Sequence, residues 1–472
     1  FIWDFADQAL HGTDSNGLKI FTYGGDYNTY DPSDNNFNCN GIFFADRRPN
    51  PMAYEVKYWY QSIWTELLDE PTGQITVKNE NFFKNLDNVK LLWSVENCEN
   101  FEHKILQKGE IEQLAILPQQ RTAYTLNYKT NDAQENLLNI FYVLKNDEGL
   151  LKKGDTVAYQ QFILAPTQTS KATPKRTSNL KLEKFGKKYK VSNYMLCVEF
   201  ADNGFISKLD YYNDAMLGKG TQLQPYFWRA VTDNDMGASL QRRYQQWKNP
   251  SFELLNISPT TYCDKIIINA TYKIQEIASA KLQITYTIHN DGSIDVKQVL
   301  DVEDESVSDM FRFGMRLKMP KKFQNIKYYG RGPVENYADR KYSQLLGVYS
   351  QTVSQQFHPY VRPQESGLKS DVRWWQQTAE NTGIEILDNN AKGLQISCLN
   401  YAVEDLDEGD SKKQRHPEQI AEDKYINLII DSKHAGLGGV NTWDRDAGAL
   451  PQYRVPAQQN ALSFTLQPFR KQ

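Results

Sequence analysis

The segment from 282 to 296 restricts the fold more than any other, because its apolar and polar residues alternate strictly. Within Leu282–Ile288 every second residue is apolar, which is the period of a half-buried β-strand. Asn290–Ser293 contains Gly292 where a hairpin turn needs a positive φ, and a second alternating run follows. Residues 180–472 continue in this way, with helical signal mainly at Leu240–Lys248. A β region of this length requires two large packed sheets, so we expect a large antiparallel β-sandwich.

A second β region precedes it, at residues 67–165. Short runs rich in β-branched and aromatic residues are separated there by turn-forming clusters, a spacing typical of an immunoglobulin-like sandwich. The candidate strands are Ile75–Val77, Val89–Val95, Lys104–Gln107, Arg121–Tyr128, Leu137–Leu144 and Thr156–Leu164. Residues 166–179 show no apolar period and are interpreted as a linker.

Residues 1–66 have a different character. The chain starts without Met in an apolar run typical of a strand, and a loop, a second strand and a helix follow. Pro49 and Pro51 stand at the expected helix start, where a missing N–H costs little. The helix should bury an apolar stripe made of Met52, Val56, Trp59, Tyr60 and Ile63. Two parallel-type strands cannot cover both faces of a sheet, so we expect upstream sequence to complete this domain.

The composition favours a soluble globular protein. The chain has 472 residues, of which 40% are hydrophobic and 24% charged, and a net charge of -4. The chain lacks the excess of basic residues that is typical of nucleic-acid binding. It also has no apolar run that approaches the roughly 20 residues that span a bilayer. The charged segment Glu404–Glu422 should be a solvated, mobile loop. The 28 Tyr and 9 Trp suit a β-rich core, and such rings also stack on sugars.

The cysteines and histidines give no sign of a disulfide framework or a metal site. The five cysteines are odd in number and widely spaced, as expected of buried free thiols: Cys39, Cys98, Cys197, Cys263 and Cys398. The six histidines lack metal-ligand spacing: His11, His103, His289, His358, His416 and His434.

Several motifs resemble those of the large bacterial β-galactosidases of glycoside hydrolase family 2. Near the start, Phe1–Gln8 and the glycine-containing segments up to Arg47 resemble the last two strands of that family's catalytic barrel. Further matches follow in the family's order: Phe227–Gly237, Tyr329–Arg340, Pro359–Gly367 and Gly436–Trp443. Each motif alone would be weak, whereas the ordered set is specific.

The resemblance implies a mainly β architecture for the C-terminal part of such an enzyme. Residues 1–66 would be the tail of a (β/α)8 barrel, and 67–165 the immunoglobulin-like sandwich. After the linker, 180–472 would form a β-supersandwich that is galactose-mutarotase-like and resembles the family's small chain. Catalytic groups of such barrels lie at the C-terminal ends of the strands.

The family's galactose site carries over residue by residue. Trp3 matches the Trp that lies against galactose, although a Trp on a barrel strand is by itself more often a core residue. Phe37 and Asn40 match the Na⁺ site, through a backbone carbonyl and an amide oxygen, and oxygen ligands suit a hard cation. Without the resemblance, Asn40 before Gly41 would be a turn residue. Asp34 matches an acidic residue that orders the same loop.

Two positions in the last domain match the outer part of the site. Trp443 corresponds to the Trp that forms a platform for the second sugar, and its polar, Gly-rich surroundings also favour binding. Gly237 marks the loop that closes over bound ligand in the family. These residues complete the expected substrate contacts.

No catalytic residue is expected in this chain. Retaining glycosidases need two carboxylates roughly 5 Å apart, and in this family both precede the Trp3 strand, together with the Mg²⁺ ligands. Asp4 and Asp7 would point to opposite faces of a strand. Two further charged sets are more readily structural than catalytic: Glu335, Asp339 and Arg340, and Arg229, Asp233 and Asp235.

The sequence therefore predicts one part of a retaining β-galactosidase that acts on terminal β-D-galactosyl residues. Its partners would be the β-galactoside, the missing N-terminal part and other copies of the complete enzyme, without nucleic acid or membrane. Two alternatives stay open: a non-catalytic carbohydrate-binding or scaffold protein, and a family 2 hydrolase with another sugar specificity. The cellular compartment also stays open.

Overall fold

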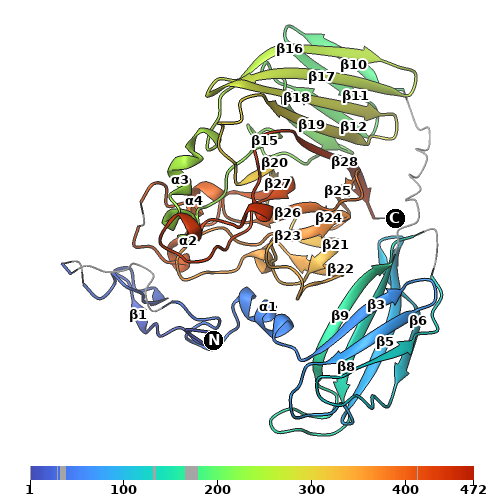
Figure 1. Ribbon diagram of the computed structural model, residues 1–472. Coiled ribbons are helices and arrows are strands. Elements are labelled where there is room, and N and C mark those ends of the chain that lie inside the picture. Colours follow the sequence, from blue (N-terminus) through green and yellow to red (C-terminus); the bar gives the residue numbers. More distant parts are fainter. Residues whose placement is uncertain are drawn as a thin grey trace. The chain divides into compact units, whose positions relative to one another are not determined.

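The computed structural model describes residues 2–28, 30–31, 39–130, 134–164, 179–411 and 413–471 (Figure 1). The chain divides into two compact units. One contains residues 1–51, 173–341 and 349–472, and the other contains residues 52–172 and 342–348. Strands predominate in both units, as the alternating sequence patterns predict. The expected domain boundaries at residues 66, 165 and 179 stay predictions.

The smaller unit is a sandwich of antiparallel sheets. Its three-stranded sheet has the order β3 (Ile63–Asp69), β4 (Gln74–Asn79), β7 (Arg121–Thr125). Its four-stranded sheet has the order β6 (Glu102–Ile111), β5 (Val89–Glu99), β8 (Asn136–Leu144), β9 (Thr156–Leu164). Leu91, Val95 and Ile140 are fully buried between the sheets, because alternate residues of β5 face inward. The predicted immunoglobulin-like architecture is confirmed.

Helix α1 (Pro51–Trp59) begins at one of the two prolines that predicted it. The predicted apolar stripe is wrong in part, because Trp59 is 53% exposed and Tyr60 is 67% exposed. The buried residues of this helix are Pro51, Ala53, Glu55 and Tyr58. Ile63 lies in β3 and not in the helix, so the apparent helical period ran across an element boundary.

The supersandwich consists of three sheets, whose strands belong to the larger unit except for residues 345–348. The first sheet is β10 (Lys181–Phe185), β11 (Lys188–Ser192), β12 (Leu196–Phe200), β13 (Ile206–Tyr211), β14 (Asp214–Ala215). The second is β15 (Gln224–Tyr226), β20 (Arg312–Pro320), β27 (Tyr425–His434), β26 (Leu394–Leu399), β23 (Lys369–Val372). The third and largest is β16 (Phe252–Thr261), β17 (Lys265–Ile274), β18 (Ile277–His289), β19 (Ile294–Val302), β28 (Asn460–Arg470), β25 (Thr382–Asp388), β24 (Trp374–Thr378), β21 (Asn325–Gly332), β22 (Leu345–Thr352).

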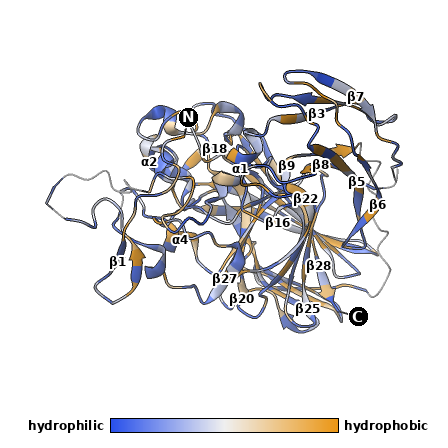
Figure 2. Ribbon diagram, turned by 90° about the horizontal axis from the view of Figure 1, so that it is seen from below, coloured by the Kyte–Doolittle hydropathy of each residue, from blue (hydrophilic) through white to orange (hydrophobic). Residues whose placement is uncertain are grey.

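One continuous apolar core joins these sheets. Hydrophobic and hydrophilic residues alternate along many strands in Figure 2, and the apolar ones face this core. Ile284 and Phe464 enter it from the largest sheet, and Phe313 and Ile430 enter it from the β20–β27 pair. The predicted hairpin is confirmed, because β18 and β19 flank Gly292, whose φ is +82°. The C-terminal segment β28 pairs with both β19 and β25, so it lies inside the sheet.

The helices among the described residues of the larger unit are short. They are α2 (Asp233–Gly237), α3 (Leu240–Arg243), α4 (Val403–Leu406), and the 3₁₀ turns η1 (Gln245–Trp247), η2 (Ser354–Gln356), η3 (Pro417–Gln419), η4 (Arg445–Ala447) and η5 (Pro451–Tyr453). The helix predicted at Leu240–Lys248 is present as two pieces, α3 and η1.

Two sequence-based expectations about exposure are wrong in part. The segment 404–422 is exposed at Glu404 and Glu422, as expected, yet Glu408 is 2% exposed and His416 is 2% exposed. Their charges have partners inside the fold, as described below, which composition could not show. Among the cysteines, Cys398 is buried but Cys263 is exposed, so the expectation of uniformly buried thiols is also wrong.

Described residues of the first segment, up to position 51, pack on loops of the supersandwich within the larger unit. Their regular structure is a short hairpin of β1 (His11–Thr13) and β2 (Lys19–Phe21), together with a parallel bridge between Ala6 and Phe43. Tyr23 and Phe44 are buried in a small apolar cluster with Val361 from the last domain. The first segment is therefore held by side chains from a region more than three hundred residues away along the chain.

Candidate functional site

The segment that starts at Trp3 runs parallel to the segment that starts at Asn40. The N–H groups of Ile42 and Phe43 donate to the carbonyls of Asp4 and Phe5, at 3.3 and 3.1 Å. Trp3 is 78% exposed and is therefore not a core residue of the described chain. The ladder is the pairing expected of two neighbouring barrel strands.

Asp7 fastens the backbone next to Asn40. Its carboxylate accepts the N–H of Gly41 at 2.7 Å, and burial raises the pKa of this carboxyl to about 6. A side chain at position 41 would collide with the Asp7 nitrogen, because an added Cβ would lie 2.3 Å from it. Asp7 and Gly41 therefore set the position of Asn40. The sequence interpretation excluded Asp7 from catalysis and missed this supporting role, for which the sequence carried no signal.

The amide of Asn40 is exposed, and no hydrogen bond engages it among the described residues. Asp7, Asp26 and Asp233 all raise the pKa of the neighbouring Cys39 thiol, after burial, which is the main cause. The charges of three carboxylates therefore reach Cys39, the residue next to Asn40. An accessible amide oxygen is a suitable ligand for a hard cation. The described residues show no cluster of three or more His, Cys, Asp or Glu that could hold a metal ion.

Trp443 stands on a compact polar loop. Its N–H donates to the side-chain oxygen of Asn441 at 3.1 Å, and Asp444 caps η4 by accepting the N–H of Asp446 at 2.8 Å. Val440 donates its N–H to the carbonyl of Asp446 at 2.7 Å, which closes the loop. These bonds present the indole of Trp443 to solvent, with 76% of the residue exposed.

Gly237 lies directly against this loop. A Cβ added to Gly237 would be 2.2 Å from the carbonyl oxygen of Thr442 and 3.0 Å from the nitrogen of Trp443. The Asn234 amide also donates to the carbonyl of Ala447 at 3.1 Å. The turn at α2 and the Trp443 loop are thus adjacent, although they are far apart in sequence.

Buried charges hold the α2 turn. Arg229 pairs with Asp235 at 2.7 Å and donates to the carbonyls of Ala435 and Gly436. Asp235 also completes a capping box with Thr232 at the start of α2. The expectation that Arg229 and Asp235 hold a loop is confirmed.

A second buried network joins the α2 turn to the segment 404–422. Arg362 lies between Asp233, at 3.0 Å, and Glu408, at 2.8 Å. His416 contacts Asp26 at 3.1 Å, which ties the first segment to the same region. Sequence reasoning missed this network, because its members come from four separate segments.

The predicted site residues thus fall into two described groups. Trp3 and Asn40 lie on the paired first segments, and Gly237 lies beside the Trp443 loop. No hydrogen bond or ring contact between described residues joins Trp3 or Asn40 to Trp443. Asp34 and Phe37 lie outside the described residues. The roles of all five predicted substrate contacts stay predictions.

Three family descriptions match successive parts of the chain. "Glycosyl hydrolases family 2, TIM barrel domain" matches residues 1–65, and "Beta-galactosidase, domain 4" matches residues 75–165. "Beta galactosidase small chain" matches residues 193–467. Together they cover the barrel tail, the smaller sandwich and the supersandwich in that order.

Similar proteins named as β-galactosidases occur in several bacteria. One from Priestia megaterium is 31% identical over 99% of this chain and 44% of its own length. One from Lactobacillus delbrueckii subsp. bulgaricus is 28% identical, again over 99% of this chain and 44% of its own length. The chain thus spans less than half the length of these relatives.

Among solved structures, a galactose 1-epimerase from Lactobacillus acidophilus NCFM is similar to 63% of this chain and to all of that chain. Its sequence identity is 9% and its TM-score is 0.32. No described helix has the length and apolar character needed to cross a bilayer.

Proposed function

We propose, because this chain belongs to the β-galactosidase small-chain family, that it completes a retaining β-galactosidase that hydrolyses terminal β-D-galactosyl residues. The supporting observation is that the three family matches run in order through the chain, and that the β-galactosidase from Priestia megaterium aligns over 99% of it. The relatives extend well beyond the aligned region, so the missing part of the same enzyme would be the partner of this chain. The complete enzyme would be a homo-oligomer.

In this proposal the first segment contributes to the galactose site. The exposed Trp3 indole would lie against the apolar face of the galactosyl unit. The Asn40 amide oxygen, with the Phe37 carbonyl, would hold Na⁺, which when bound orients the 6-hydroxyl of galactose. Asp7, through Gly41, would keep Asn40 in place, and Asp34 would order the intervening loop.

The last domain would form the wall around the leaving group. Trp443 offers a flat, exposed ring, and the polar loop beneath it is fixed by its own hydrogen bonds. Gly237 allows the α2 turn to lie against that loop without a collision. Substrate contact by these two elements would exclude water from one side of the glycosidic oxygen.

The nucleophile and the acid/base would come from the part of the enzyme that this chain does not contain, as would the Mg²⁺ ligands. We therefore expect the 472-residue chain alone to show no hydrolysis of nitrophenyl β-galactoside above background. Neither a glycosyl-enzyme nor protonation of the leaving group is available without that pair.

The test is complementation. The purified chain is mixed or co-expressed with the N-terminal part of the Priestia megaterium relative, cut where the alignment begins, and galactosidase activity is measured. Activity that requires both parts, and that Trp3→Ala in this chain strongly reduces, supports the proposal. Activity of the chain alone that a point mutation within it removes would refute the division of labour. Saturable galactoside binding by the chain alone, with no activity in any mixture, would favour a carbohydrate-binding protein.

A further inference from the structure

A pocket in the supersandwich is lined by four arginines and by no acidic residue. It has a cavity volume of about 20 Å³ and is partly open to solvent, and its arginines are Arg229, Arg243, Arg445 and Arg454. The other lining residues are small or apolar apart from Tyr244. Clustered like charges repel one another, so such an arrangement calls for a compensating anion.

Three of the four arginines are exposed at the mouth of the pocket, and no carboxylate of the described residues neutralises them. Arg229 is satisfied by Asp235, but Arg243, Arg445 and Arg454 have no ion-pair partner among the described residues. Arg454 uses one N–H to donate to the carbonyl of Ala449 at 2.7 Å. Its remaining donors and those of the other two arginines have no protein acceptor in the described chain.

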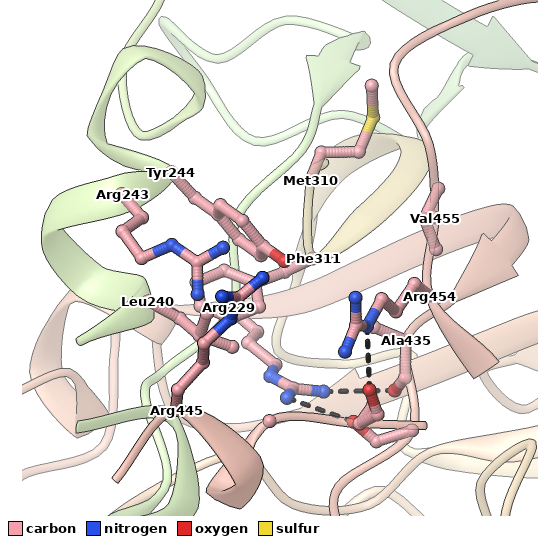
Figure 3. Close-up of a pocket in the computed structure, with 13 residues that line it drawn as sticks. Arg229, Leu240, Arg243, Tyr244, Met310, Phe311, Ala435, Arg445, Arg454 and Val455 are labelled. Carbon is pink, nitrogen blue, oxygen red and sulfur yellow. Dashed lines mark hydrogen bonds between the residues drawn. The ribbon is translucent and has the colours of Figure 1, made fainter. Parts of the chain in front are cut away.

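The three side chains come from separate elements and converge. Arg243 extends from α3, Arg445 from η4, and Arg454 from the turn after η5, and Figure 3 shows all three directed into the pocket. Tyr244 lies within their reach, because Arg243, Arg454 and Arg229 all counteract the rise of its pKa, which burial takes to about 12. The phenol is therefore neutral at physiological pH.

The nearby carboxylates are committed to other contacts or lie outside the lining. Asp339 accepts the N–H groups of Leu437 and Gly438, each at 2.9 Å, and Asp444 caps η4. Asp309 acts on Tyr244 from outside the pocket lining. None of them supplies a counter-charge within the pocket.

We propose that this pocket binds a phosphoryl group, either inorganic phosphate or a phosphate monoester, through Arg243, Arg445 and Arg454. Guanidinium groups form paired, charge-assisted hydrogen bonds with phosphate oxygens, and three that converge from different directions match a tetrahedral dianion. One side of the lining is apolar and includes Leu240 and Met310. This site is separate from the proposed galactose contacts.

A bound phosphoryl group would also connect two loops. Arg243 follows the Gly237 turn on α3, and Arg445 follows Trp443 in η4, so one anion held by both would link the two elements. The loop 436–448 should then open less often, and its backbone amides should exchange more slowly with solvent.

The test is a titration of the 472-residue chain with inorganic phosphate at pH 7.5 and constant ionic strength, followed by calorimetry and by hydrogen exchange. We expect saturable binding that weakens about tenfold or more in Arg445→Gln and disappears in the double variant Arg243→Gln/Arg445→Gln. Arg242→Gln is the matched control, because Arg242 is an exposed neighbour on α3 that does not line the pocket. The Arg242→Gln variant should bind phosphate as the parent does. Phosphate should slow the hydrogen exchange of the amides in 436–448 only in those proteins that still bind it.

Thermal unfolding gives a second readout, in which the double variant is expected to be the more stable protein without phosphate. Without phosphate, the double variant should unfold at a higher temperature than the parent, because two repelling charges are gone, whereas with phosphate the parent should gain stability and the variant should not. Equal loss of binding in Arg242→Gln would mean nonspecific attraction to surface charge and would overturn the site. Tighter binding of succinate than of phosphate would overturn the assignment to a tetrahedral dianion. Non-saturable binding would overturn both the site and the assignment of its ligand.

Discussion

The indole of Trp443 is held outward by the backbone of its own loop, and its exposure results from these short-range bonds. An aromatic side chain that is 76% exposed contributes little to the stability of the fold and can be removed without forming a cavity. The same holds for Trp3, which is 78% exposed. Substitutions at these positions should therefore report on binding with little effect on stability.

In the complemented enzyme, Trp443→Ala should raise KM for aryl galactosides more than it lowers kcat. The ring stacking that is lost is worth about 1 kcal/mol, which corresponds to a rise in KM of roughly fivefold. Val440→Ala is a suitable control, because Val440 is an equally exposed apolar residue of the same loop. An unchanged KM for all leaving groups would remove Trp443 from the site.

Trp3→Ala should behave differently in the same assay. A residue that contacts the galactosyl unit acts on the part of the substrate that changes shape in the transition state, so kcat/KM should fall steeply for every galactoside. Measuring kcat/KM for a series of leaving groups checks this. A loss that varies with the leaving group would place Trp3 near the aglycone instead.

At the scale of elements, close backbone packing joins the α2 turn to the Trp443 loop. Gly237→Ala places a Cβ 2.2 Å from the Thr442 carbonyl oxygen, and backbone atoms cannot move aside as a flexible side chain can. We expect a destabilisation of about 1–3 kcal/mol in urea unfolding, together with a raised KM in the complemented enzyme. Gly448→Ala is the matched control, since its Cβ would meet nothing closer than 3.6 Å. Equal stability of both variants would contradict the observed packing.

His358 joins the first segment to the last domain and should make stability depend on pH. Its Nε2 lies 3.2 Å from the side-chain oxygen of Asn50, and its ring packs on Phe44 and Tyr360. Burial lowers its pKa from 6.5 to about 4, and Arg340 and Arg48 act in the same direction against Glu335. Between these values the unfolded chain binds more protons than the folded chain, so the stability that His358 contributes is lost as pH falls from 6.5 towards 4.

Unfolding of the parent and of His358→Gln across this pH range isolates the contribution. Glutamine can still bond to Asn50 but does not titrate, so the difference in unfolding free energy should favour the parent more at higher pH. A difference that stays constant with pH would assign the acid sensitivity to other groups.

At the scale of the whole molecule, the two compact units have separate cores. The core of the smaller unit includes Leu91, and that of the larger includes Leu282, both fully buried. We expect scanning calorimetry to resolve two unfolding transitions, because cooperativity follows a shared core. Leu91→Ala should lower only one transition and Leu282→Ala only the other, each losing about 2–5 kcal/mol. A single transition shifted by both variants would contradict independent cores.

Much of the architecture was predictable from local patterns. Alternation along the segment from 282 to 296 predicted β18, its turn and β19, because side-chain direction in a strand has a period of two residues. The ordered motifs predicted the family and the mainly β fold. The helix at α1 was predicted by its prolines, whereas its buried face was not, because the tertiary contacts of Tyr58 and Ala53 decide which side is covered.

By itself, the sequence determined the mainly β fold, through the two-residue period of its strands, and the family, through its ordered motifs. Only the tertiary structure decided which charges meet. Glu408 and His416 lie in a segment whose composition indicates a solvated loop, yet Arg362 and Asp26 from distant segments pair with them in the interior. Arg243, Arg445 and Arg454 converge in the same way on one pocket. Residues far apart in sequence come together through the packing of the sheets, and no local pattern carries that information.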